Sequence, residues 1–387
     1  MTDRRRNLLI VAALLVVLAV GAIVLRSAVW TLALAAPLAL AGVVLLRGNR
    51  WRNGGLMAAA VALGALGVNA FAAWFAPAPA AMGAGVVQTT NPKEWMPPEP
   101  VLGYRLLPNL KVEVTETYNG ELLYRVFYTT DALGMRATPA APPGADTYLF
   151  MGDSFMLGDG LPDEETLPWQ FARARDYKVR AVNFSAPGYG PNHLVRAFEA
   201  GLVDRYKNER VKAVVTWIIP SHLARVTGDG GWLGASPRYV LESGVPRHTG
   251  SFTEHRLFNP LAGLTYLAGN HLAFVKAIGE RQRQQTQGDL FVALLVQLQA
   301  LARERLGVPL IVIYSWPDAV AVDRPGDASL VRLIERLREQ GVPLLSVDKA
   351  VTGYPVADLL IPHDGHPTGL TTRLVAEELA RRLIDRR

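Results

Sequence analysis

A serine, a histidine and an aspartate stand in segments whose context suits nucleophilic catalysis. Gly152-Asp153-Ser154 follows the apolar run "TYLFM", so Ser154 falls on a turn at the point where a buried strand should end. Asp364 and His366 share the glycine- and proline-bounded loop "PHDGHPTG". Histidine is the usual general base for a serine, and a neighbouring carboxylate fixes the imidazole tautomer and stabilises the imidazolium. The pattern predicts Ser154 as nucleophile, His366 as base and Asp364 as the residue that orients the base.

A third segment, "NFSAPGYG" (Asn183–Gly190), forms a glycine-bearing turn after another apolar run. Such a turn lets backbone N–H groups approach a substrate, and N–H donors stabilise the oxyanion of acyl transfer. Each segment also has an ordinary structural interpretation. These are a β-turn at Ser154, a strand-to-helix turn at Asn183–Gly190, and helix capping by Asp364 and Thr368.

The surrounding pattern indicates how these segments could be brought together. From Asp146 onward short apolar segments alternate with helical ones, which predicts a parallel sheet covered on both faces. Ligands of such sheets bind at the carboxyl ends of the strands, and Ser154 lies just past one such end. The predicted strands lie in "TYLFMG", "VRAVNFS", "VKAVVTWIIP", "PLIVIYSW" and "VPLLSVD", and a long helix is predicted over about 264–306.

The predicted catalytic domain covers residues 141–387 and follows a smaller element. Residues 95–140 show strand-like alternation and turn residues, which predict a small β-rich element. Residues 78–94 are expected to be a flexible linker. At about 226–262 a segment rich in glycine, proline and serine lacks periodicity, and we expect an inserted lobe or loop there.

The amino-terminal part differs from the rest of the chain. Three apolar runs without charged residues, Asn7–Leu25, Ala28–Leu46 and Gly54–Ala76, approach the ~20 residues that cross a bilayer as a helix. A signal peptide and buried core helices are the alternatives, but the first run lacks a small-residue cleavage site. We expect residues 1–77 to form a three-helix transmembrane segment in contact with the lipid bilayer.

Arginine placement predicts the orientation of these spans. Residues 1–52 contain seven arginines and one acid, so they carry the whole net charge of +6, which therefore gives no evidence for a nucleic-acid partner. All of these arginines except Arg26 lie before the first run or between the second and third. The excess of arginine on one side places the amino terminus inside the cell. The expected location is the bacterial inner membrane, multi-pass, with the catalytic domain in the periplasm or outside the cell.

Taken in order, these three segments resemble the SGNH (GDSL) hydrolase superfamily, over a match from about Asp146 to the carboxyl terminus. The upstream "GYRLLPN…GMR" resembles the branch of membrane-linked polysaccharide O-acetyltransferases and O-acetylesterases. The resemblance implies a three-layer α/β/α, flavodoxin-like fold. It also implies that Ser154 is the nucleophile, and that the backbone N–H groups of Gly188 and Ser154 form an oxyanion hole.

Two positions depart from the family pattern. The family's third block supplies an asparagine after the third strand, whereas "IIPSHLAR" offers His222, with Ser221 as a poorer candidate for the same oxyanion role. His222 is otherwise a surface histidine at the start of a loop. The family often has aspartate three residues before the histidine, where this chain has His363, and Asp364 lies two residues before.

These features predict a membrane-anchored extracytoplasmic serine acyl esterase or acyltransferase acting, through an acyl-enzyme, on O-acetyl groups of a cell-wall or exported polysaccharide. Water as acceptor gives an esterase; a sugar hydroxyl gives a transferase, which would need a multi-span membrane protein as acyl donor. The missing asparagine favours the alternative, a non-catalytic polysaccharide-binding or assembly-scaffold protein on a decayed SGNH fold. The chain has no cysteine, HExxH motif or phosphate loop, so the sequence predicts no metal and no cofactor.

Overall fold

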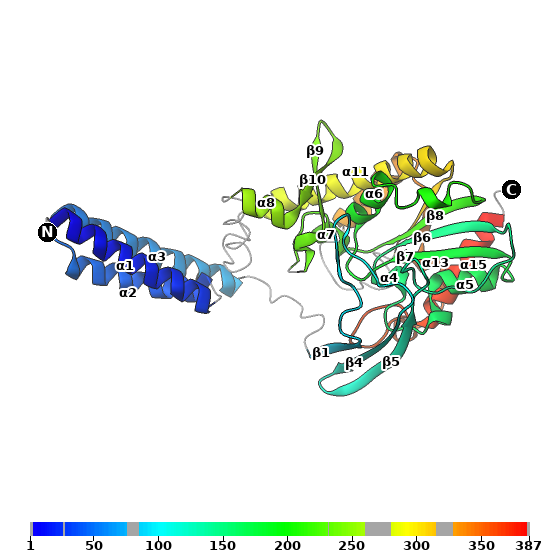
Figure 1. The fold of residues 1–387 in the computed structure, drawn as a ribbon, viewed down its shortest axis with the longest axis horizontal. Coiled ribbons are helices and arrows are strands. Elements are labelled where there is room, and N and C mark those ends of the chain that lie inside the picture. The colour runs from blue at the N-terminus through cyan, green and yellow to red at the C-terminus, as the bar shows by residue number, and fades with distance from the viewer. Residues whose placement is uncertain are drawn as a thin grey trace. The chain divides into compact units, whose positions relative to one another are not determined.

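The computed structural model describes residues 3–25, 28–75, 85–230, 232–259, 280–314 and 328–384 (Figure 1). The chain divides into two compact units. The first comprises Met1–Ala80 and His255–Arg283, and the second comprises Ala81–Glu254 and Gln284–Arg387.

A five-stranded parallel sheet forms the centre of the second unit. Its strand order is β12-β11-β8-β6-β7. The next two strands in the chain, β7 and β8, therefore lie on opposite sides of the first strand, β6. This order creates a switch point beside β6, where α/β sheets bind their ligands. The predicted parallel sheet is confirmed, with strands β6 (Asp146–Gly152), β7 (Val179–Ser185), β8 (Val211–Ile218), β11 (Leu310–Tyr314) and β12 (Leu344–Ser346).

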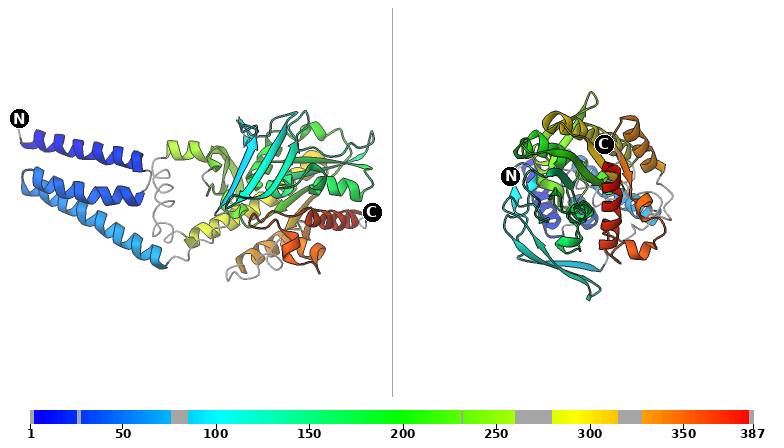
Figure 2. Two further views of the ribbon diagram at one scale, coloured as in Figure 1. Left: turned by 90° about the horizontal axis from the view of Figure 1, so that it is seen from below. Right: turned by 90° about the vertical axis from the view of Figure 1, so that its right-hand side faces the viewer.

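Helices cover both faces of this sheet because its strands are apolar on both sides. Along β6, Tyr148 and Phe150 join one buried cluster, whereas Leu149 and Met151 join the other. The first cluster is covered by α5 (Leu167–Ala174) and α15 (Gly369–Ile384). The second is covered by α6 (Pro191–Glu199), α11 (Glu280–Leu306) and α12 (Ala328–Glu339). The result is the expected three-layer α/β/α arrangement (Figures 1 and 2).

The β-rich element begins earlier than the sequence predicted. The antiparallel strands β1 (Val86–Asn91), β4 (Lys111–Tyr118) and β5 (Glu121–Thr129) form a sheet in the order β1-β4-β5, and β2 (Pro98–Glu99) pairs with β3 (Gly103–Tyr104). The predicted linker 78–94 is therefore corrected, because its second half pairs with β4. Residues 76–84 lie outside the described part of the chain.

The insertion carries regular structure instead of an irregular loop. A hairpin joins β9 (Pro237–Glu242) to β10 (Val245–Ser251), and α8 (Phe252–Phe258) follows. Both turn residues, Ser243 and Gly244, have positive φ, as a tight two-residue hairpin turn requires. Of the predicted helix over 264–306, the part before Glu280 lies outside the described residues. The remaining short helices are α4 (Ser154–Leu157), α7 (His222–Arg225), α13 (Val347–Val351) and α14 (Val356–Leu359).

The first unit contains three helices where the three apolar runs predicted them: α1 (Asp3–Leu25), α2 (Ala28–Leu45) and α3 (Asn49–Phe75). The Asn7 side chain donates to Arg47 O (2.7 Å) and accepts from Arg47 N (3.1 Å), which joins α1 to the end of α2. Among the described residues no helix combines the length and apolar character needed to cross a membrane, so the predicted transmembrane segment is not supported.

Candidate active site

The turn that carries Ser154 is fixed by its neighbours. A Cβ on Gly152 would lie 2.7 Å from the Cβ of Met156, so only glycine fits where β6 turns into α4. The Asp153 carboxylate accepts a hydrogen bond from Phe155 N (3.0 Å) and caps α4. Gly158, with φ of 84°, ends the helix after one turn. Ser154 is thus presented at the carboxyl end of β6.

The loop that carries His366 is closed by backbone hydrogen bonds. Ile361 N donates to His366 O (2.8 Å), and Gly365 N donates to Ile361 O (2.9 Å). Gly365 has a φ of 86°, which favours glycine. These bonds set the imidazole between α14 and α15 in a defined position.

The structure brings together the three residues predicted for catalysis. His366 Nδ1 lies 2.8 Å and 2.9 Å from the two Asp364 carboxylate oxygens, and His366 Nε2 lies 2.8 Å from Ser154 Oγ. With Nδ1–H donating to the carboxylate, Nε2 is left to accept the serine proton. Ser154 and His366 are 212 positions apart in the chain, so the fold alone creates this contact. Asp364 binds the imidazole and is not used as a helix cap.

Carboxylates around His366 favour its protonated form. Burial by itself lowers the pKa of His366, but the hydrogen bond that His366 donates to Asp364 and the negative charges of Asp159, Asp364 and Asp153 outweigh it and raise the pKa to about 9. The imidazolium that forms after proton transfer is therefore strongly stabilised.

The predicted oxyanion donors lie on neighbouring turns. Ala186 N donates to Gly152 O (3.2 Å), which joins the turn after β7 to the end of β6. In that turn Gly188 has a φ of 81°. Within the described residues, no acceptor binds the backbone N–H of Ser154 or of Gly188. Both groups are therefore available to a substrate oxygen.

The structure does not support the oxyanion role predicted for His222. The His222 ring is buried, with Nε2 3.0 Å from Asp153 Oδ2 and Nδ1 accepting from Ile219 N (3.4 Å). Both ring nitrogens are thus occupied inside the protein, and His222 is not a surface histidine either. Burial lowers the pKa of His222. Burial by itself would raise the pKa of Asp153, but His222 and then Arg225, which lies 2.7 Å from the same Asp153 oxygen, hold it below its ordinary value. Ser221 is exposed and lies immediately before α7, at its N-cap position.

A contact between the β-rich element and the catalytic loop was not predicted from the sequence. The Tyr118 ring of β4 stacks on His363, with ring centroids 3.9 Å apart and planes 2° from parallel. His363 is thus held by the β-rich element, and Asp364 is the residue of this loop that binds His366. The only signal in the sequence was the aromatic residue at the end of "KVEVTETY".

A buried acidic cluster lies beside the same loop. Glu116 and Asp159 are 3% and 6% exposed. Gln88 Nε2 donates to Glu116 Oε2 (3.3 Å) and Asp159 Oδ1 (3.4 Å), and Tyr124 Oη donates to Glu116 Oε2 (3.0 Å). Burial and the charge of Asp364 raise the pKa of Glu116. These residues were not predicted from the sequence, because an acidic residue on an amphipathic strand, such as Glu116, or in a turn, such as Asp159, is normally expected to face solvent.

Arg136 supports the loop that carries Asp159. Its buried guanidinium donates to Leu157 O (3.1 Å), Gly158 O (2.8 Å) and Leu161 O (2.5 Å), and it pairs with Asp163 (3.0 Å). Through these four partners, the buried Arg136 side chain links the end of the β-rich element to the segment around and after the end of α4.

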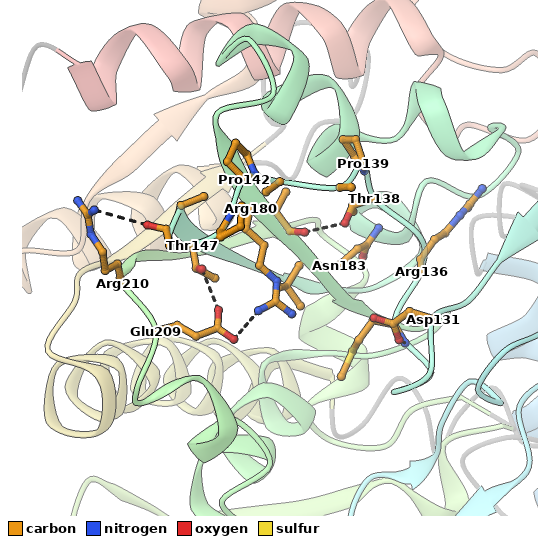
Figure 3. Close-up of a pocket in the computed structure, with 18 of the residues that line it drawn as sticks. Asp131, Arg136, Thr138, Pro139, Pro142, Thr147, Arg180, Asn183, Glu209 and Arg210 are labelled. Carbon is orange, nitrogen blue, oxygen red and sulfur yellow. Dashed lines mark hydrogen bonds and ion pairs between the residues drawn. The ribbon is translucent and has the colours of Figure 1, made fainter.

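A separate cavity of about 750 Å³ is lined by residues from β6 and β7, among them Thr147 and Arg180 (Figure 3), and Ser154 does not line it. Glu209 lies between Thr147, whose hydroxyl it accepts (2.8 Å), and Arg180, with which it forms an ion pair. Thr138 donates to Ala181 O (2.7 Å). These polar groups satisfy one another, so the triad, and not this cavity, is the candidate site. In the described part of the chain, no cluster of histidine and acidic residues is arranged to hold a metal ion.

No family model and no curated protein matches this sequence. Solved structures do match, and their descriptions name SGNH or GDSL hydrolases and esterases. A psychrotrophic esterase from a Pseudoalteromonas species is 13% identical, with 62% of this chain and 97% of that chain covered and a TM-score of 0.36. A carbohydrate acetylesterase from Sinorhizobium meliloti is 9% identical (62% and 100%, TM-score 0.35), and an SGNH-hydrolase family esterase is 11% identical (64% and 98%, TM-score 0.35).

Proposed function

We propose that this protein is an SGNH-type serine esterase or acyltransferase. The observation that carries the proposal is the unbroken hydrogen-bonded chain from Ser154 Oγ through His366 to Asp364. An isolated turn, cap or surface histidine would not require this alignment. The same chain of contacts disfavours the alternative of a non-catalytic scaffold, since the proposed nucleophile, base and orienting carboxylate are all in place.

The geometry supports a two-step acyl transfer. Ser154 Oγ adds to the ester carbonyl carbon while His366 Nε2 takes the hydroxyl proton, and the carbonyl π pair moves onto oxygen. The N–H groups of Ser154 and Gly188 donate to this oxyanion. When the intermediate collapses, the C–O bond to the leaving group breaks and His366 protonates the departing alkoxide. The acceptor then attacks the acyl-enzyme with His366 again acting as base, which restores Ser154.

The proposed substrate is an O-acetyl ester on a cell-wall or exported polysaccharide, as the resemblance of the sequence implies. Water as acceptor completes hydrolysis. A sugar hydroxyl completes transfer, in which case a separate multi-span membrane protein is the proposed acyl donor. No metal or cofactor takes part in the proposed steps.

A fluorophosphonate probe tests the proposal directly. The probe phosphonylates a serine, with loss of fluoride, only when a base activates that serine, so peptide mapping should locate the label on Ser154. Acetate release from an acetylated polysaccharide, measured with and without an added sugar acceptor, separates hydrolysis from transfer. Absence of both label and acetate release would favour the scaffold alternative.

We also propose that the amino-terminal helices attach the protein to a membrane and that the catalytic unit lies outside the cytoplasm. Large apolar side chains on these helices are exposed, as a lipid-facing surface requires. They include Leu8, Leu9, Leu15, Val16 and Val17 on α1, Leu40 and Val44 on α2, and Leu56, Met57, Val61, Leu63 and Val68 on α3. The arginine asymmetry supports the orientation.

Reporter fusions test this attachment. Alkaline phosphatase joined after Arg387 should be active, and a fluorescent protein that folds only in the cytosol should be dark. The fusion protein should remain in the membrane fraction after a carbonate wash. The reverse reporter pattern, or release by carbonate, would contradict the proposal.

A further inference from the structure

The proposed oxyanion hole lacks its third donor. The segment that directly follows the third strand, "IIPSHLAR", has no asparagine, and His222 is bound to Asp153 and Ile219 N. Two backbone N–H groups, of Ser154 and Gly188, remain. A side-chain donor facing the Gly188 turn would complete the set.

Trp232, in the insertion, faces that turn with the N–H edge of its indole. A Cβ placed on Gly188 would lie 2.8 Å from Trp232 Nε1 and 3.3 Å from its Cδ1. The same Cβ would lie 2.8 Å from Tyr104 Oη, but that hydroxyl already donates to Pro187 O (2.7 Å). Within the described residues, the indole N–H has no acceptor, and 63% of Trp232 is exposed. Trp232 is thus the uncommitted donor beside Gly188.

We propose that Trp232 Nε1–H is the third donor to the oxyanion in the acyl transfer that Ser154 performs. The inference rests on the proposed function and names a residue that the family pattern does not contain. When Ser154 Oγ bonds to the carbonyl carbon, the negative oxygen gains a hydrogen bond from the indole. No proton leaves the indole, because tryptophan is a donor only. Its contribution is therefore independent of pH across the working range.

The glycine at position 188 fits this role. A side chain there would collide with both the indole and the Tyr104 hydroxyl. Tyr104 and Trp232 flank the turn, and Tyr104 fixes the carbonyl of Pro187. The indole N–H of Trp232 therefore lies beside the turn that carries the Gly188 N–H.

Trp232→Phe tests the donor, because it keeps an aromatic ring and removes the N–H. We expect kcat for p-nitrophenyl acetate to fall about 10²-fold with KM nearly unchanged, as for loss of one oxyanion donor. The second readout is the rate ratio between an oxygen ester and the matching thionoester. Sulfur accepts hydrogen bonds weakly, so the wild type should prefer the oxygen ester and Trp232→Phe should lose part of that preference. Trp232→His, which restores a ring N–H, should recover part of kcat.

Tyr177→Phe is the matched control, since it removes one polar group from an exposed aromatic residue at the opposite end of β7. It should change neither kcat nor the ratio. If Trp232→Phe keeps kcat within a few-fold, or lowers kcat with an unchanged ratio, the inference is wrong. If instead the wild type turns over ester independently of Ser154, the proposed function itself fails, so the two failures are distinct.

Discussion

Ser154→Ala is expected to lower kcat for p-nitrophenyl acetate by about 10⁶-fold, to the level left by binding and oxyanion stabilisation alone. Among the described residues, the Ser154 hydroxyl is the group that hydrogen-bonds to His366 Nε2 (2.8 Å), so its removal leaves the base without a nucleophile to activate. The measurement is a burst and steady-state assay, together with loss of fluorophosphonate labelling.

The fold should survive this substitution. Alanine removes one hydroxyl from a nearly buried position and leaves the Asp153 cap of α4 intact. The thermal unfolding midpoint should therefore stay close to that of the wild type. Ser251→Ala, in the insertion, is the matched control and should retain full activity. Wild-type turnover in Ser154→Ala would show that another residue is the nucleophile.

Asp364→Asn is expected to lower kcat by about 10⁴-fold, less than the loss of Ser154. The aspartate accepts the Nδ1–H of His366 and so leaves Nε2 free to take the serine proton. An asparagine amide can present an N–H to Nδ1, which favours the wrong tautomer. A residual rate equal to that of Ser154→Ala would contradict a purely orienting role, and an unchanged rate would contradict any role.

The pH profile of Asp364→Asn provides a second measure. Only neutral His366 is a base, and its pKa is raised to about 9, so wild-type kcat/KM should rise with pH up to about that value. Removing the Asp364 carboxylate removes a principal cause of the raised pKa, so the midpoint of the rise should move down. Asp159 and Asp153 remain and keep part of the effect. A wild-type midpoint at the ordinary histidine value of about 6.5 would contradict this account.

The sequence was sufficient for the core of the fold. The apolar segments around Phe150, Val182 and Val214 predicted strands because they are short, are bounded by turn residues and alternate with helical segments. That pattern is local in the sequence, so the strands can be predicted from it without knowledge of tertiary contacts. β1 was missed because "VVQTTN" has only two apolar residues and its burial pattern is mostly exposed. Its pairing with β4 depends on a partner more than 20 residues away.

The candidate site was likewise predictable in part from the sequence, and in part only from tertiary contacts. By itself the sequence determined the residue types and their order: a serine after β6, a glycine turn after β7, and Asp364 with His366 before α15. It could not determine that both ring nitrogens of His222 are occupied, because Asp153, which binds Nε2, lies 69 positions away in the chain. Nor could it place Tyr118 against His363 or Trp232 against Gly188. Side-chain orientation depends on packing between segments that are distant in the sequence. The local sequence pattern does not specify that packing, so only the tertiary structure decided those contacts.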